Sequence, residues 1–136
     1  MTLTPFAFFV GFLALGAPAI AQSHCFKTVH EVRANHVKAQ WRETTENDGK
    51  PMTISIANGA GGLVYSAHKA GKLWLSGNIS VCRAEGRIAI TLENTKTTSN
   101  VPIFARASFP RTQSARIEGN HITLAAGGWS GTFVGN

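Results

Sequence analysis

Acidic side chains are scarce in this chain, and those present are scattered. Seven Asp and Glu residues stand against 13 Lys and Arg, and the acids form none of the carboxylate pairs that a glycosidase requires. The Ser-Gly pairs at 76–77 and 130–131 lack the GxSxG context of a hydrolase nucleophile. His30 and His36 lack the i, i+4 spacing of an HExxH zinc site. The sequence therefore assigns no catalytic residue.

Cysteine is also rare, since only Cys25 and Cys82 occur and neither lies in a CxxC motif. This argues against a thiol redox centre and against a thiolate zinc site. An even number of cysteines in an exported chain is typical of disulfide bonding, so we expect one Cys25–Cys82 bond, with two free thiols as the alternative. Closing that loop would stabilise the fold by roughly 4 kcal/mol.

No hydrophobic run is long enough for a comfortable membrane span. The apolar core over 6–15 falls short of the about 20 residues that a spanning helix needs. It leads into Ala19-Ile20-Ala21, a small-x-small cleavage pattern. We therefore expect a signal peptide over 1–21 and a single β-rich domain over 22–136. We expect this domain to be periplasmic or secreted. A retained membrane anchor is the alternative, because no Lys or Arg precedes the run.

Positive charge is in excess, with a formal net charge of +6. Between 69 and 116 lie eight bases and only the two acids Glu85 and Glu93; the bases are Lys69, Lys72, Arg83, Arg87, Lys96, Arg106, Arg111 and Arg116. Such a field attracts a small anionic ligand or an acidic protein or polymer. A merely solvated basic surface is the alternative. We expect neither nucleic acid as the main partner nor stable membrane insertion after processing.

Hydrophobic periodicity predicts one helix followed by strands. Over 24–41, Cys25, Val29, Val32 and His36 share one helical stripe, and Ser23 is a candidate N-cap. Short alternating runs between turn signals follow at 41–46, 52–56, 63–67, 73–82, 87–93, 101–109, 115–117, 122–126 and 129–134. This pattern indicates a mainly β fold, a small antiparallel barrel or sandwich of about eight strands preceded by an N-terminal helix.

The strand at 73–82 permits a finer expectation. Strict alternation would set Leu73, Leu75 and Val81 on one face, and Trp74 and Cys82 on the other. Gly77, in the middle of the strand, is expected to mark a bulge or a sharp bend.

Cleavage after Ala21 would expose Gln22-Ser23-His24, whose amine, backbone nitrogens and imidazole suit Cu(II) or Ni(II) in a square plane. A third-position His also arises by chance, and an N-terminal Gln readily cyclises and removes the amine. We therefore assign no metal and no cofactor.

Aromatic and basic residues supply the candidate ligand contacts. Tyr65, Trp74 and Trp129 would offer apolar contacts, while Arg83, Arg87, Arg106 and Arg111 would offer charge. The alternative is that the aromatics fill the core. No motif of a known family can be placed residue by residue on the chain.

The sequence thus favours an exported, non-enzymatic binding protein for an amphipathic or anionic envelope ligand. A protein inhibitor or immunity factor that blocks an exported hydrolase is the second hypothesis. An enzyme of unknown type is the third.

Overall fold

The computed structural model describes residues 23–44, 49–106, 109–126 and 129–136. A nine-stranded antiparallel sheet runs in the order β7-β6-β5-β4-β3-β2-β9-β8, and β1 pairs with β5 off this path. The strands are β1 His24–Cys25, β2 Gln40–Glu43, β3 Met52–Gly59, β4 Gly62–Lys69, β5 Lys72–Ala84, β6 Arg87–Thr97, β7 Thr112–Arg116, β8 His121–Ala126 and β9 Trp129–Gly135. The helices are α2 Val29–Ala34 and α3 Ile103–Arg106. The predicted signal peptide lies outside the described residues.

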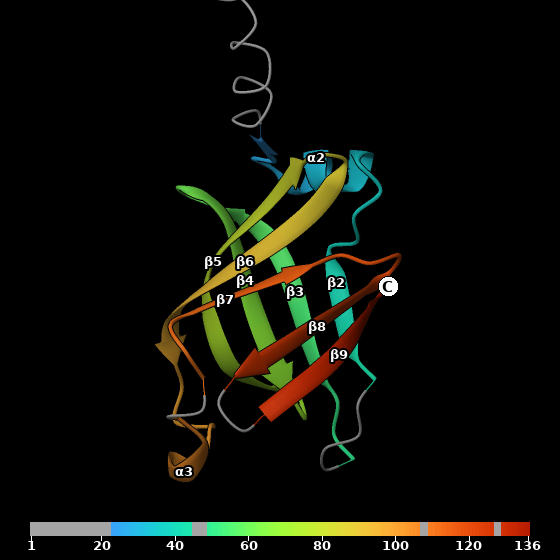
Figure 1. Ribbon diagram of the computed structural model, residues 1–136. Coiled ribbons are helices and arrows are strands. Elements are labelled where there is room, and N and C mark those ends of the chain that lie inside the picture. The colour runs from blue at the N-terminus through green and yellow to red at the C-terminus, as the bar shows by residue number, and fades with distance from the viewer. Residues whose placement is uncertain (1–22, 45–48, 107–108, 127–128) are drawn as a thin grey trace, which may run out of the picture.

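The sheet curls into a nearly closed barrel, which confirms the mainly β antiparallel prediction and selects a barrel over a sandwich (Figure 1). The two ends of the path, β7 and β8, touch. In the described part of the chain no hydrogen-bonded ladder joins them. The barrel is therefore nearly closed at this seam, where the two strands lie near each other without pairing.

Alternating apolar side chains fill the barrel. On β3, Met52, Ile54 and Ile56 are buried while the residues between them are partly exposed. Trp41 and Phe133 are among the largest buried side chains, and the Trp41 indole N–H donates to the Lys38 carbonyl at 3.1 Å. Burying each such side chain contributes about 1.5–3 kcal/mol, so this face holds the principal core.

Two tight turns fold the central strands into hairpins. Ala70 and Gly71 both have positive φ, and so do Glu85 and Gly86. Left-handed backbone at both central residues twists a two-residue turn to match the strands, and glycine adopts it without steric cost. The turns expected between the runs 63–67, 73–82 and 87–93 are therefore confirmed.

The N-terminal helix predicted over 24–41 is much shorter in the structure. Of residues 24–41, only Val29–Ala34 are helical. The hydroxyl of Thr28, not of Ser23, caps α2 by accepting the Glu31 N–H at 3.1 Å. His36 then leaves the helix with a φ of 64°, a left-handed conformation that ends helices.

Strand β1 precedes α2 and lies against β5. In its register Cys25 stands directly opposite Cys82, and the two sulfurs are bonded. The predicted disulfide is confirmed, and it fastens β1 and the start of α2 to one end of the barrel.

Residues 101–109 were expected to form a strand, and this prediction is also wrong. Strand β6 continues to Thr97, and the chain then enters a loop that contains α3. Pro102 stands directly before α3, where its fixed φ suits a helix start and its missing N–H costs no helical hydrogen bond. The apolar residues that resemble a strand in the sequence therefore lie on a short helix outside the sheet.

Two bulges shape β5. Ala67 pairs with Leu75 and His68 with Leu73, which leaves Trp74 as the extra residue of the first bulge. A second register shift lies between Ser76 and Gly77 on the β6 side. The Gly77 prediction is confirmed, whereas strict alternation fails at Trp74, because a bulge resets which side chains share a face.

Candidate functional site

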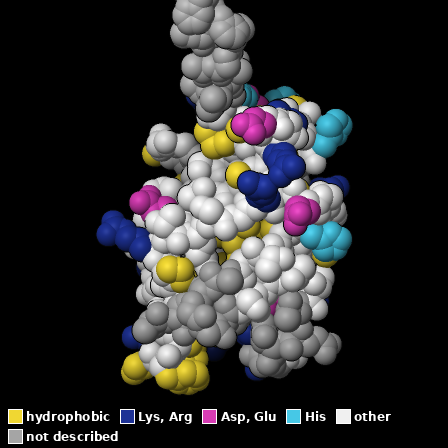
Figure 2. All heavy atoms as spheres, in the orientation of Figure 1, with side chains coloured by type: hydrophobic (Ala, Val, Ile, Leu, Met, Phe, Trp, Pro, Cys, Tyr) yellow, Lys and Arg dark blue, Asp and Glu magenta, His cyan; other side chains and the backbone are white. Residues whose placement is uncertain are grey.

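The loop between β6 and β7 exposes two large apolar side chains. Ile103 is 79% and Phe104 86% exposed, and both belong to α3. Figure 2 shows hydrophobic side chains gathered at the lower left, where Figure 1 places α3. Two adjacent apolar side chains on one protruding helix form a patch rather than scattered single contacts, and exposed patches are typical of interaction sites.

Hydrogen bonds fix the conformation of α3. The Ala105 N–H donates to the Pro102 carbonyl at 2.9 Å. The Arg106 side chain turns back on the loop, where its Nε donates to the Val101 carbonyl at 3.0 Å. Val101 itself is fully buried. Arg106, predicted as a ligand contact, thus also holds the loop that presents Ile103 and Phe104.

The loop is fastened to the start of β5. The Thr98 N–H donates to the Trp74 carbonyl at 2.9 Å. The Thr98 hydroxyl and the Asn100 side-chain amide both donate to the Leu73 carbonyl, the latter at 3.0 Å. A bulge frees carbonyls from the regular ladder, and here the loop uses them as its anchor.

Trp74 lies where the loop meets the barrel interior. Its half-buried ring packs against the core and meets the Phe109 ring edge to face. The Lys69 Nζ lies 5.3 Å from the centroid of the Trp74 ring, within the range of a cation–π contact. Lys69 is buried, as is Glu43, whose Oε1 accepts the Met52 N–H at 3.0 Å. Neither buried charge was predicted from the sequence. The available signal was the strand alternation, because Glu43 and Lys69 each lie two positions after a buried apolar residue and so share its face.

Exposed cations lie on or next to the strands that flank or anchor the α3 loop. Lys72 precedes the anchoring residues of β5, Lys96 lies near the end of β6, and Arg111 leads into β7. The Asn94 N–H donates to the Arg111 carbonyl at 2.7 Å, which holds Arg111 beside β6. Residues 94–112 contain no Asp or Glu. We call the set Ile103, Phe104, Lys72, Lys96 and Arg111 the α3 end.

The seven predicted ligand contacts are not brought together. Trp74, Arg106 and Arg111 lie at or beside the α3 end, and Figure 1 places the start of β9, Trp129, at the same end of the barrel. The side chain of Trp129 lies outside the description. Arg83 and Arg87 lie at the far end of the β5–β6 hairpin.

Arg83 and Tyr65 are both at least partly buried in the fold. Arg83 is half-buried, and its Nη2 lies 3.5 Å from Oδ1 of Asn35 at the end of α2. Tyr65 is 5% exposed on β4, and burial raises its pKa to about 12. Tyr65 also borders an open hollow of about 390 Å³ that residues of β3, β5 and β6 line with it.

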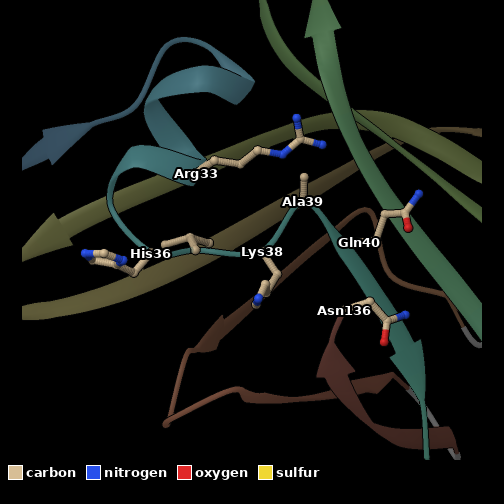
Figure 3. Close-up of a pocket in the computed structure, with 7 residues that line it drawn as sticks. Arg33, His36, Lys38, Ala39, Gln40 and Asn136 are labelled. Carbon is tan, nitrogen blue, oxygen red and sulfur yellow. The ribbon is translucent and has the colours of Figure 1, made fainter.

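The opposite end of the barrel has two open hollows. The first, about 570 Å³, is lined by Arg33, His36 and Lys38, a basic group that sequence reasoning missed despite its close spacing. In Figure 3 these side chains point in different directions, so their charges do not converge on one point. The second, about 880 Å³, lies beside the disulfide and the turn at 58–62, and Lys27 is the one cation among its described lining residues.

The predicted Cu(II) or Ni(II) motif depends on Gln22, which lies outside the described residues. The His24 ring lies in the structure with its Nε2 2.9 Å from Oε2 of Glu31. The Lys27 N–H and then His24, both hydrogen-bonded to the Glu31 carboxylate, lower its pKa. Across the described ranges, no three His, Cys, Asp or Glu side chains could hold a metal ion.

In the part of the chain that the structure describes, no helix has the length and apolar character to cross a bilayer. Comparison with protein-family models, curated proteins and solved structures finds no match for this chain. The α3 end is the surface where predicted contacts and exposed apolar side chains coincide.

Proposed function

We propose that this protein is an exported, non-enzymatic binding protein for an amphipathic, anionic ligand of the cell envelope, and that it binds at the α3 end. The observation that carries this proposal is the exposure of Ile103 and Phe104 beside Lys96 and Arg111 on an anchored loop. An apolar chain would bury the two side chains, and an anionic group would meet the cations.

The disulfide is compatible with an oxidising, exported location. We propose that the working protein is periplasmic or secreted. There the ligands within its reach include amphiphiles that carry a phosphate or carboxylate group.

Calorimetric titration with three probes tests the proposal. Dodecyl phosphate below its micelle concentration carries both chain and charge, inorganic phosphate carries charge alone, and dodecyl maltoside carries the chain alone. We expect dodecyl phosphate to bind about tenfold or more tightly than either control, since burying a chain adds apolar contact to the charge attraction. No binding of dodecyl phosphate, or equal binding of all three, would refute the proposal.

The same loop favours a second candidate, an inhibitor or immunity factor that blocks an exported hydrolase. A side chain such as Phe104, presented on a loop with a fixed conformation, is suited to fill a partner's cleft because little ordering cost remains. A photoreactive amino acid in place of Phe104 tests this candidate in cells. One discrete, salt-sensitive protein adduct would support it, and adducts to lipid alone would reject it.

A further inference from the structure

We propose that the α3 end docks the protein reversibly on the surface of an anionic lipid bilayer. This inference rests on the proposed function and deepens it, because it names the ligand as a membrane surface instead of a dispersed molecule.

α3 presents its two large apolar side chains to solvent. Ala105 and Phe109 pack against the core on one side of the loop. Ile103 and Phe104 are 79% and 86% exposed on the other. The loop therefore lies between the barrel and the partner that the two apolar side chains contact. A flat partner can contact both side chains without any rearrangement of the barrel.

The protrusion of Ile103 and Phe104 favours a broad surface as the ligand. Pockets for small molecules enclose most of the ligand surface. Ile103 and Phe104 protrude instead of lining a wall, so a single dispersed chain would cover only part of each side chain. A bilayer surrounds a protruding side chain on all sides, because the acyl region closes around it.

Lys72, Lys96 and Arg111 are exposed on or next to the strands beside the loop, and residues 94–112 contain no Asp or Glu. Glu93 pairs with Thr112 in the sheet, and its carboxylate accepts a hydrogen bond from the Asn78 amide at 3.1 Å. Three exposed cations therefore stand against this one acid. Anionic headgroups attract each nearby cation, and this attraction decays within a Debye length. The affinity of a protein segment for a membrane surface increases with the apolar area it buries and with its attraction to anionic lipids. Two apolar side chains and a few cations should therefore give reversible binding.

The test is vesicle flotation with the protein purified from the exported fraction. Vesicles of phosphatidylcholine mixed with phosphatidylglycerol are compared with vesicles of phosphatidylcholine alone, at low and high salt. We expect binding to the anionic vesicles only, and a loss of that binding as salt increases.

Two variants probe the apolar and charged contributions. Ile103→Ser combined with Phe104→Ser should weaken vesicle binding about tenfold or more, since burying even one such side chain is worth that factor. Phe104→Leu should retain most of the binding. Lys96→Gln combined with Arg111→Gln should weaken binding about tenfold, because each cation near the surface contributes a few-fold.

A matched control removes the same charge at the opposite end of the barrel. Arg87 begins β6, and Arg116 lies beside it because it pairs with Ala89. Both side chains are exposed. Arg87→Gln combined with Arg116→Gln should leave vesicle binding nearly unchanged. An equal loss in both charge pairs would show that the overall net charge, not the α3 end, drives binding, and would overturn the proposal.

The remaining outcomes separate this inference from the proposed function. Binding of dodecyl phosphate monomers without binding of vesicles would overturn membrane docking and leave the proposed function standing. Binding of neither would remove both. A salt-sensitive complex with an acidic protein, without vesicle binding, would overturn docking in favour of a protein partner. All variants should keep the thermal unfolding midpoint of the parent protein, because every substituted side chain is exposed.

Discussion

The indole ring of Trp74 meets the phenyl ring of Phe109 edge to face, with 6.4 Å between the ring centroids and 86° between the planes. Trp74 is the extra residue of the β5 bulge, and Phe109 follows α3 in the same loop between β6 and β7. This contact joins the loop to the barrel, so the surface that exposes Phe104 is ordered before any ligand arrives. Prior order lowers the entropy cost of binding.

The Trp74–Phe109 contact should be measurable as a coupling. Trp74→Ala and Phe109→Ala should each destabilise the protein, and the double variant should lose about 1 kcal/mol less than the sum, because aromatic pairs contribute that much beyond buried area. Denaturant unfolding of the four proteins gives the coupling. Strictly additive losses would show that the rings do not stabilise one another.

Gly77 should not tolerate a side chain. A Cβ at this position would lie 1.9 Å from the Glu93 carbonyl oxygen and 2.8 Å from the Thr95 nitrogen, both backbone atoms of the bulged β6. Gly77→Ala should therefore cost about 3 kcal/mol or more. Gly61→Ala is the matched control, since nothing lies within 4 Å of its Cβ. Similar unfolding midpoints for the two variants would contradict the close packing of β5 on β6.

Tyr65 is the single tyrosine of the chain, so tyrosinate absorbance reports its titration alone. Burial raises its pKa to about 12, and we expect a midpoint near that value in the native protein and near the ordinary value of about 10 after unfolding.

The raised pKa of Tyr65 makes the free energy of unfolding depend on pH. Between pH 10 and about 12 the native state keeps a proton that the unfolded state has lost, so stability should fall as pH rises through this window. Denaturant titrations at fixed pH values across the window measure the slope. A native midpoint near 10 would place the Tyr65 hydroxyl in water.

The disulfide should supply a large share of stability. Cys25 and Cys82 are 57 positions apart, and opening a loop of this length costs about 4 kcal/mol on the chain-entropy model. Cys25→Ser combined with Cys82→Ser should lower the unfolding free energy by about that amount. Reductant should have the same effect on the parent protein and none on the double variant, and an unchanged parent would contradict the prediction.

The central strands were predictable because two independent signals agree there. Alternation over Met52, Ile54 and Ile56 marks a half-buried strand, and the glycines at 71 and 86 mark tight turns. The disulfide was predictable from two cysteines in a chain expected to be exported. Their direct pairing on β1 and β5 was not, because register depends on the whole sheet.

The candidate site was only partly predictable. The run 101–109 is apolar enough for a strand, but just before it Thr98 and Asn100 hydrogen-bond to the Trp74 and Leu73 carbonyls, and the chain then forms α3. Such a tertiary interaction is not encoded by local sequence. Ile103 and Phe104 therefore escaped notice as surface residues. The helical stripe over 24–41 failed for a related reason: β1 pairs with β5, and that pairing overrides helical spacing.

The most direct test of the proposed binding surface is a backbone amide NMR titration with dodecyl phosphate below its micelle concentration. We expect the shift changes to concentrate in residues 98–106 and 109–112 and at the start of β5, around Leu73 and Trp74. Changes that concentrate instead around α2, Arg83 and Arg87, or no changes at all, would contradict binding at the α3 end.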